Sequence, residues 1–235
     1  MTHTTQLPII AFLPCRRGSE RVKAKNTRPF AGIEGGLTRI KMEQLLNCPE
    51  IDSIVVSTDD ITVAEICQNL ATEYSKSVKI FERPAHLATS NASTDDVIKY
   101  VPEIITDGVI LWTHVTSPFI DSSVYTAAIQ AYRENVNLDR YDSLMSVTKL
   151  QKFIWNANGP INYEREREKW PRTQTLAPLY EVNSAIFLAP IETYMRKHDR
   201  VGKKVYLFEL TASQAMDIDW EEDFQLAQEY WNHGR

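Results

Sequence analysis

Short apolar runs alternate with helical patterns along most of the 235 residues, and few folds accept such a sequence. Residues Pro8–Leu13 and Ser53–Ser57 are β-branched and apolar on both faces, which is typical of parallel strands covered by helices. Alternating strands and helices predict an open, mostly parallel α/β sheet with right-handed crossovers and helices on its faces. The expected strands are Pro8–Leu13, Ser53–Ser57, Val78–Phe81, Val109–Val115, Ser143–Val147, Val182–Leu188 and Lys204–Leu210; the expected helices are Leu37–Leu46, Ile61–Tyr74, Ser93–Ile105, Ser122–Asn135 and one from about Trp220.

The alternation stops between residues 149 and 180. This segment contains QKFIWNANGP, the charged run YEREREKWPR and prolines at 171 and 178, which together suit a core poorly. We therefore expect one α/β domain formed by residues 1–148 and 181–235. Residues 149–180 would form a protruding arm that contacts another subunit.

The net charge of −5 argues against a general nucleic-acid-binding protein. Three cysteines without metal-ligand spacing indicate reduced thiols in a cytoplasmic protein. The apolar run near the N-terminus is short and lacks a basic flank, so we expect a buried strand rather than a signal peptide. Apolar stretches long enough to span a membrane are also missing.

A basic segment, PCRRGSERVKAKNTRPF, follows the first expected strand. It carries six Lys and Arg residues against the single acid Glu20. Gly18 and Ser19 allow a tight turn whose backbone N–H groups can point at an anion. Ligands of open α/β sheets bind beyond the carboxyl ends of the strands, where this segment lies. That position favours a triphosphate site over the alternatives, a solvated basic loop or a nucleic-acid contact.

Two aspartates lie two residues apart near the C-terminus, in MDIDW. In extended chain Asp217 and Asp219 point the same way, and two carboxylates suit Mg²⁺ that bridges substrate oxygens. The alternative is a structural role: Asp219 with Glu222 three residues later can cap the last helix. A cap explains Asp219 but leaves Asp217 without a role.

The order Arg-x-Gly-Ser-x-Arg-x-x-x-Lys-Asn over residues 16–26 resembles the signature loop of the CMP-sialic acid synthetases, or acylneuraminate cytidylyltransferases. Pseudaminic and legionaminic acid cytidylyltransferases share it, and CMP-Kdo synthetases have a looser version. Further similar segments follow in the family's order over nearly the whole chain: IVVSTDD (54–60), ERPAHLATSNAS (82–93), HVTSP (114–118), PRTQ (171–174), NSAIF (183–187) and MDIDWEEDF (216–224).

The resemblance implies a Rossmann-like domain of the nucleotide-diphospho-sugar transferase type, with a projecting dimerisation arm and hence a homodimer. It implies a cytidylyltransferase that transfers CMP from CTP to the anomeric hydroxyl of a nonulosonic, sialic-acid-like sugar acid and releases pyrophosphate. Mg²⁺ would be the cofactor. No nucleic acid or membrane partner is expected.

The resemblance also assigns residue roles. The nucleotide-binding set is Arg16, Ser19, Arg21, Lys25, Asn26, Thr94 and His114. The acceptor-binding set is Lys152, Arg172, Asn183 and Phe187. Mg²⁺ would be held by Asp217 and Asp219. The catalytic residues would be Arg16, Lys25 and Asp217, because phosphoryl-type transfer depends mainly on positioning and charge stabilisation.

Several positions depart from the family pattern. Lys23 replaces a usual Pro, His114 a Gln and Ser184 a Gly, while SPFI replaces S-P-L-R. The triphosphate loop and the aspartate pair are intact, so the acceptor is less constrained than the reaction. Kdo, a pseudaminic- or legionaminic-type sugar and a phosphonate stay open as acceptors. A non-catalytic nucleotide-binding homologue is the alternative from another functional class.

Overall fold

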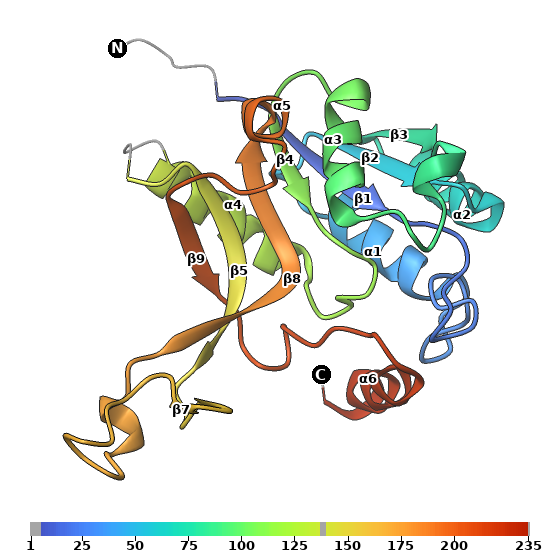
Figure 1. Cartoon of the computed structure of the whole chain (residues 1–235). Helices are drawn as coiled ribbons and strands as arrows, with labels where there is room; N and C mark the ends of the chain where they lie inside the picture. The colour runs from blue at the N-terminus through green and yellow to red at the C-terminus, as the bar shows by residue number, and fades with distance from the viewer. Residues whose placement is uncertain (1–5, 137–139, 235) are drawn as a thin grey trace.

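The computed structural model describes residues 6–136 and 140–234, and a seven-stranded sheet forms its centre (Figure 1). The sheet strands are β1 (Ile9–Pro14), β2 (Ser53–Thr58), β3 (Ser77–Glu82), β4 (Val109–Trp112), β5 (Ser143–Leu150), β8 (Leu179–Pro190) and β9 (Val205–Glu209). The α-helices are α1 (Gly36–Leu46), α2 (Ile61–Glu73), α3 (Thr94–Ile104), α4 (Ser122–Val136), α5 (Ile191–Lys197) and α6 (Glu221–His233). A two-stranded ribbon, β6 (Trp155–Asn156) and β7 (Gly159–Pro160), lies apart.

The strand order is β3-β2-β1-β4-β8-β5-β9. Strand β8 pairs antiparallel with β4 and β5, whereas the other described pairs within the sheet are parallel. The expected mostly parallel α/β sheet is therefore confirmed. The chain leaves the carboxyl end of β1 toward β2, on one side, and leaves the carboxyl end of the neighbouring β4 toward β5, on the other side. A crevice opens between the ends of two strands whose connections diverge in this way.

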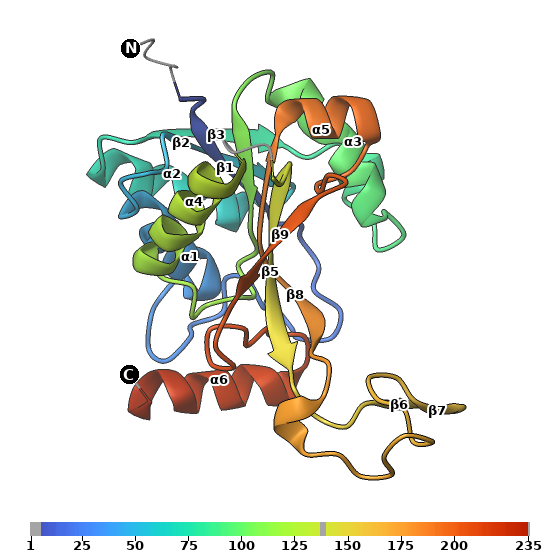
Figure 2. The same ribbon diagram turned by 90° about the vertical axis from the view of Figure 1, so that its left-hand side faces the viewer.

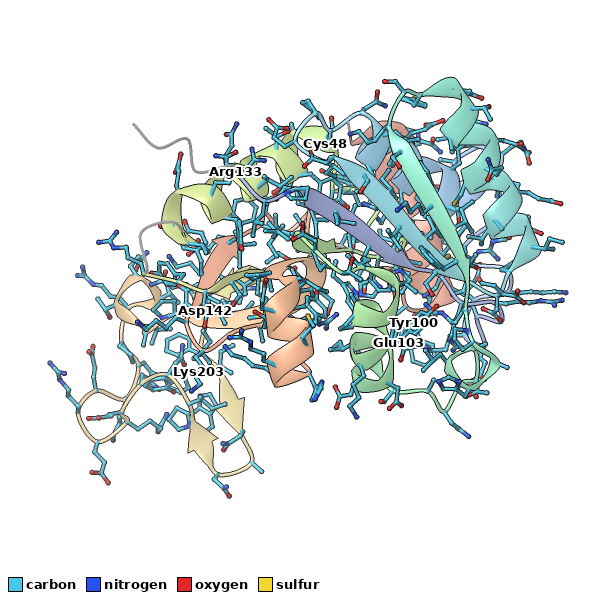
Figure 3. All side chains as sticks on the ribbon, turned by 90° about the horizontal axis from the view of Figure 1, so that it is seen from above. Cys48, Tyr100, Glu103, Arg133, Asp142 and Lys203 are labelled. Atoms are coloured by element: carbon cyan, nitrogen blue, oxygen red, sulfur yellow. The ribbon has the colours of Figure 1, made fainter. Side chains whose placement is uncertain are left out.

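Apolar residues on both strand faces bury two separate cores. Ala11 and Leu13 face the core beneath α1, α2, α4 and α6, while the intervening Phe12 faces the core beneath α3 and α5. Figure 3, seen from above, shows the same division: Cys48 and Arg133 lie on one side of the sheet, and Tyr100 of α3 lies on the other. Successive side chains of β1 point to opposite faces of the sheet, and helices cover both faces. Both faces of β1 are therefore apolar.

Strand β4 ends at Trp112, three residues before the predicted end, because the chain turns into a loop fixed by α1. The ammonium of the fully buried Lys41 donates to the carbonyls of Ser117 (2.9 Å) and Ile120 (3.3 Å) and to the Tyr125 hydroxyl (2.9 Å). Gln44 donates to a further carbonyl in the loop, that of Pro118. This loop, residues 113–120, carries His114 and Thr116 to the crevice.

Helix α6 begins one residue later than expected, and its capping differs from the prediction. The carboxylate of Asp223, rather than that of Asp219, accepts hydrogen bonds from the backbone N–H of Asp219 (3.0 Å) and of Trp220 (2.7 Å). The alternative in which Asp219 caps the last helix is therefore wrong. Trp220 is 57% exposed, whereas Phe224 and Ala227 form the buried face of α6. By contrast, Ser93 and Asp96 form a capping box at the start of α3.

The chain between β5 and β8 projects from one end of the sheet and carries the β6–β7 ribbon (Figures 1 and 2). Its interior is small. The amide of Asn162 donates to the carbonyls of Lys152 (2.8 Å) and Ala177 (3.0 Å), and Phe153 packs edge-to-face against Trp170. Much of its apolar surface is open, since Trp170 is 65% exposed and Ile161 51%. None of the described helices is both long and apolar enough to cross a bilayer.

Candidate functional site

A cleft of about 420 Å³ opens at the carboxyl ends of β1 and β4. A second hollow of about 220 Å³ adjoins it and shares Pro14, Arg16 and His114 with the cleft. All seven residues predicted to bind the nucleotide line these two spaces: Arg16, Ser19, Arg21, Lys25, Asn26 and His114 line the cleft, and Thr94 lines the second hollow. The structure thus gathers residues from segments about 100 positions apart in the sequence.

The basic loop is folded by its own polar groups. Gly18 has φ +78°, the left-handed region that favours glycine, and its carbonyl accepts a hydrogen bond from the Arg16 guanidinium (3.2 Å). The amide of Asn26 donates to the Arg16 carbonyl (3.1 Å), while the Asn26 carbonyl accepts from the Thr38 hydroxyl (2.9 Å). Asn26 therefore joins both ends of the loop to α1 in this conformation.

The basic loop and the aspartate segment lie against each other. The ammonium of Lys25 donates to the Ile218 carbonyl (2.7 Å), and the Arg21 guanidinium lies 3.1 Å from the Asp219 carboxylate. The N–H of Ile218 donates to the carbonyl of Thr116, in the loop after β4 (3.0 Å). The aspartate segment thus contacts three residues that line the cleft, Arg21, Lys25 and Thr116, although the aspartates themselves are not part of its lining.

Burial shifts the pKa values of two ionisable groups where the basic loop meets the aspartate segment. Desolvation raises the pKa of Asp217, opposed by a hydrogen bond from Thr116 and by the charge of Lys25. Desolvation also lowers the pKa of Lys25, opposed by the charges of Asp219 and Asp217. Each charge favours the ionised form of the other, but burial has the larger effect, so both pKa values shift toward the neutral forms.

The donor set suits a metal ion that arrives with a ligand. Within residues 6–136 and 140–234, no group of three or more His, Cys, Asp or Glu residues is arranged to hold a metal. Asp217 and Asp219 supply two carboxylates beside cationic Lys25 and Arg21. Mg²⁺ is commonly bound by one or two carboxylates together with substrate phosphates and water, so this pair fits it.

Arg28 of the basic loop forms structural contacts with α6 and does not line the cleft. Arg28 forms a two-pronged ion pair with Glu221 (2.8 and 3.2 Å), and its guanidinium lies 3.9 Å from the centre of the Phe224 ring. These contacts fix the start of α6 against the loop. Since the aspartates directly precede α6, Arg28 also sets the position of the aspartate segment.

The two acceptor-binding residues predicted in the arm do not reach the cleft. Lys152 and Arg172 are exposed, and neither lines the cleft or the adjoining hollow. Arg172 begins a short 3₁₀ turn, Thr173–Thr175, on the projecting segment. Within a single chain, the arm is therefore directed away from the site that the body forms.

The two acceptor-binding residues predicted on β8 have structural contacts. Phe187 is 2% exposed and packs in the core with the Arg200 guanidinium 3.7 Å from its ring centre, and its substrate contact stays a prediction. Asn183 accepts from the Ser146 hydroxyl (2.6 Å) and donates to the Thr148 hydroxyl (3.2 Å) across a β-bulge. Ser184 follows with φ +57°, where the family pattern has glycine.

Sequence reasoning missed several groups that line the site. Arg83 is 6% exposed, donates to the Ser57 carbonyl (3.2 Å) and lines the second hollow together with Trp112. Ser90 and Thr116 line the cleft. Arg83 directly follows strand β3, and a basic residue at the carboxyl end of a strand is a sequence signal for a ligand contact. The part played by Thr116, which holds the aspartate segment, depends on a contact that no local pattern reveals.

Comparison with known proteins agrees with this arrangement. A family model described as cytidylyltransferase matches residues 10–232. N-acylneuraminate cytidylyltransferase from Escherichia coli is 27% identical over 93% of this chain, and pseudaminic acid cytidylyltransferase from Campylobacter jejuni is 23% identical over 93%. The alignment spans 51% of the first protein and 94% of the second, so the chain has about half the length of several N-acylneuraminate relatives.

Solved structures show the same fold. A 4-diphosphocytidyl-2C-methyl-D-erythritol synthase from Anaerococcus prevotii superposes with a TM-score of 0.65 at 14% identity, covering 97% of each chain. A CMP:2-keto-3-deoxy-manno-octonic acid synthetase, solved with CTP, also gives 0.65, at 12% identity over 97% of this chain and 100% of that one. These likenesses confirm the expected nucleotide-diphospho-sugar transferase fold.

Proposed function

This chain belongs to the cytidylyltransferase family, and from that premise we propose that it transfers CMP from CTP to a nonulosonic sugar acid. The acceptor would be a sialic- or pseudaminic-type acid that reacts through its anomeric hydroxyl and releases pyrophosphate. The family match and the relatives that act on such acids support this choice. CTP in a synthetase of the same fold supports the nucleotide.

One observation carries the proposal: the basic loop meets the aspartate segment. Lys25 donates to the Ile218 carbonyl at 2.7 Å and Arg21 pairs with Asp219 at 3.1 Å. A magnesium triphosphate needs cations for its phosphate oxygens and carboxylates for its metal, within one ligand length. These contacts bring the two charge types together at the sheet edge where ligands of such folds bind.

The chain's residues would act by binding and by charge. Arg16 and Lys25 would stabilise negative charge on the α-phosphate and the leaving pyrophosphate. The acceptor hydroxyl would attack the α-phosphorus in line, forming a new P–O bond while the bond to pyrophosphate breaks. Asp217 and Asp219 would hold Mg²⁺, which when bound neutralises phosphate charge. Arg21, now paired with Asp219, would then turn to the phosphates.

The acceptor half of the site would require a second subunit. Lys152 and Arg172 are exposed on the arm and do not line the cleft. Trp170 and Ile161 leave apolar surface of the arm exposed. We expect a homodimer in which this surface packs against the partner. The arm would then carry its Arg172 to the partner's cleft, where a guanidinium suits a carboxylate of the acceptor.

A panel of acceptors tests the reaction. The protein is incubated with CTP and, in turn, a sialic, pseudaminic, legionaminic or Kdo acid and a phosphonate, with and without Mg²⁺. Pyrophosphate release and the mass of the CMP conjugate are measured. We expect Mg²⁺-dependent conjugation of at least one nonulosonic acid. CTP binding without turnover on any acceptor would instead indicate a non-catalytic nucleotide-binding protein.

A further inference from the structure

Two neighbouring side chains at the end of β4 form a hydrogen-bonded pair with unusual chemical consequences. The indole N–H of Trp112 donates to Nε2 of His114 at 2.9 Å. Trp112 is 1% exposed and is held from two sides: Phe12 packs edge-on with ring centres 4.9 Å apart, and Tyr194 stacks at 6.5 Å with an interplanar angle of 10°. The donor is therefore fixed in place by the core.

The direction of this bond determines which nitrogen of His114 carries its proton. An indole N–H can donate but has no lone pair to accept with. Nε2 must therefore be unprotonated, and in a neutral imidazole the proton is then on Nδ1. A charged imidazolium would instead set one N–H against another.

The surroundings of His114 favour the neutral ring. Burial lowers the pKa of His114 to about 3, with further lowering from the charges of Arg200, Lys25, Lys41 and Arg83. The guanidinium of Arg200 lies 5.2 Å from the centre of a Trp112 ring. Cations thus approach His114 from the loop after α5, from the basic loop, from α1 and from the end of β3.

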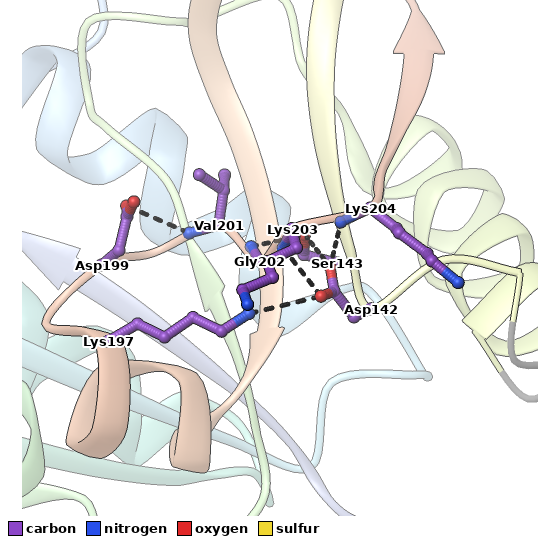
Figure 4. A network of polar contacts seen from close by, with 8 residues as sticks. All are labelled: Asp142, Ser143, Lys197, Asp199, Val201, Gly202, Lys203 and Lys204. Carbon is purple, nitrogen blue, oxygen red and sulfur yellow. Dashed lines mark hydrogen bonds and ion pairs between the residues drawn. The ribbon is translucent and has the colours of Figure 1, made fainter.

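The loop that supplies Arg200 is itself held firmly. Asp142 accepts hydrogen bonds from the backbone N–H of Lys203 (2.7 Å) and Lys204 (3.0 Å), and its carboxylate pairs with Lys197 at 3.3 Å (Figure 4). The same carboxylate occupies the space that a Cβ on Gly202 would need, so a larger residue does not fit there without a shift of Asp142. The cation behind the Trp112–His114 pair is therefore part of a rigid framework.

We propose that His114 is a specificity-determining residue that acts only as a donor, binding an anionic oxygen of the substrate through Nδ1–H. Trp112 is the positioning residue that fixes this tautomer. His114 lines both the cleft and the adjoining hollow, and no other described residue forms a hydrogen bond with its Nδ1. Because its one lone pair is occupied by Trp112, His114 does not serve as the general base.

The proposal rests on the proposed function for the identity of the substrate. An anionic oxygen in this cleft has two sources, a phosphate of CTP and the carboxylate of the acid acceptor. The cations surrounding the ring favour either one over a neutral group. Separate measurements of CTP binding and acceptor use distinguish them.

The tautomer is tested without any activity measurement. Long-range ¹H–¹⁵N NMR spectra of the whole protein, labelled at histidine, are recorded from pH 8 to pH 5 and assigned by the loss of one signal in a His114→Gln variant. We expect one protonated and one unprotonated ring nitrogen whose shifts do not change over this range. Averaged nitrogen shifts, or titration near pH 6.5, would overturn the proposal even if the protein transfers CMP.

The donor role is tested with two variants of the same shape. In His114→Gln the side-chain carbonyl can accept from Trp112 while the amide donates to substrate; in His114→Glu the carboxylate accepts from Trp112 but presents only oxygen to the substrate. Both keep the indole N–H paired, and chemical denaturation checks that each variant is folded under the assay conditions. We expect activity within a few-fold of wild type for the first, and a loss of about 100-fold or more for the second, because hydrogen bonds to charged groups are strong.

The two measurements, CTP affinity and acceptor KM, identify the source of the anionic oxygen that His114 would bind. If it belongs to CTP, the glutamate variant loses CTP affinity in calorimetry; if it belongs to the acceptor, CTP affinity is kept and the acceptor KM rises. Equal CTP affinity and equal acceptor KM in both variants would contradict the donor role. If the wild type transfers CMP to no acceptor, the proposed function fails, and the calorimetric comparison together with the NMR tautomer still decides the role of His114.

Discussion

The body of the molecule and the arm both carry residues predicted to bind substrates, but only the body assembles them. In the body, the basic loop and the aspartate segment come from opposite ends of the chain and meet through the Lys25–Ile218 and Arg21–Asp219 contacts. In the arm, Lys152 and Arg172 are exposed and line neither the cleft nor the adjoining hollow. A single chain thus gathers the residues predicted to bind the nucleotide and leaves the two predicted arm residues apart from them.

This difference has a physical origin. The body buries two cores, one on each face of the sheet, and loops at strand ends are fixed by buried polar contacts such as those of Lys41. The arm has only a small interior around Asn162 and Phe153, with Trp170 largely exposed. We expect changes in the body to abolish chemistry within one chain and changes in the arm to act between chains.

The largest expected effect is in the body. Asp217→Asn keeps the size of the side chain but removes the charge that would hold Mg²⁺, so we expect a loss of kcat of at least about 1000-fold. The variant should unfold at the wild-type midpoint or above, because burial disfavours the charged form of Asp217. Pyrophosphate release and chemical denaturation measure the two quantities. Near-normal turnover in a folded variant would remove the metal assignment.

The next effect distinguishes the arm from the body. Arg172→Ala should lower kcat/KM for the acid acceptor by about 100-fold while CTP affinity stays unchanged. Equal amounts of this variant and Asp217→Asn are then unfolded together, refolded and assayed. If arms serve the partner's cleft, half of the dimers are mixed and each has one intact site, restoring about a quarter of wild-type activity.

Two results contradict that arrangement. No recovery on mixing, with dimers present by light scattering, means that the arm serves its own chain. A monomeric wild-type protein with full activity means that no partner arm is needed to complete the site. Arg167→Ala, another exposed arm arginine, is the matched control and should leave acceptor KM unchanged.

A third effect concerns the loop that joins β4 to the cleft. Lys41→Met leaves the carbonyls of Ser117 and Ile120 without their donor, so we expect a loss of about 3 kcal/mol in the free energy of unfolding. Lys99→Met, an exposed lysine on α3, should change it by less than about 0.5 kcal/mol. Urea denaturation measures both. Equal stability of the two variants would show that Lys41 does not hold the loop.

The pH dependence gives the same residue a second test. Burial lowers the pKa of Lys41 well below 10.5, so between the lowered pKa and 10.5 the unfolded chain binds more protons than the folded protein. Wild-type stability should therefore gain a contribution as pH rises through that window, and lose it as pH falls. Lys41→Met should lack this contribution.

The smallest effect lies at the junction of body and arm, on β8. Ser184 has φ +57°, which costs a side chain about 1 kcal/mol or more, whereas glycine adopts it freely. After the entropy that glycine loses on folding, Ser184→Gly should stabilise the protein by about 0.5 kcal/mol. Ser53→Gly, in regular strand β2, should have the opposite sign. Thermal unfolding of both variants checks the prediction.

The sequence predicts the body better than the arm because its signals are local. Apolar runs at strand spacing place the loop after Leu13 and the loop after Trp112 at one edge of the sheet, and the nucleotide residues follow from that edge. Local patterns do not predict contacts between residues that are far apart in the sequence. The Arg28–Glu221 pair, the role of Asp223 as the α6 cap and the buried ammonium of Lys41 depend on tertiary packing.

Phe187 illustrates a second limit. It lies on β8, which is covered on both faces, so alternation along the strand cannot tell which side chains reach a ligand. Arg172 illustrates a third, because a residue on a projecting arm has neighbours that belong to another molecule if the chain dimerises. Local patterns thus predict which residues gather at the cleft and leave the acceptor side of the proposed site open.

The most direct test of the central claim is the affinity for CTP measured by calorimetry with and without Mg²⁺, in the wild type and in Asp217→Asn. If the basic loop and the aspartates hold one magnesium triphosphate, Mg²⁺ should tighten CTP binding by about 10-fold or more in the wild type and hardly at all in the variant. An equal Mg²⁺ effect in both proteins would contradict the account.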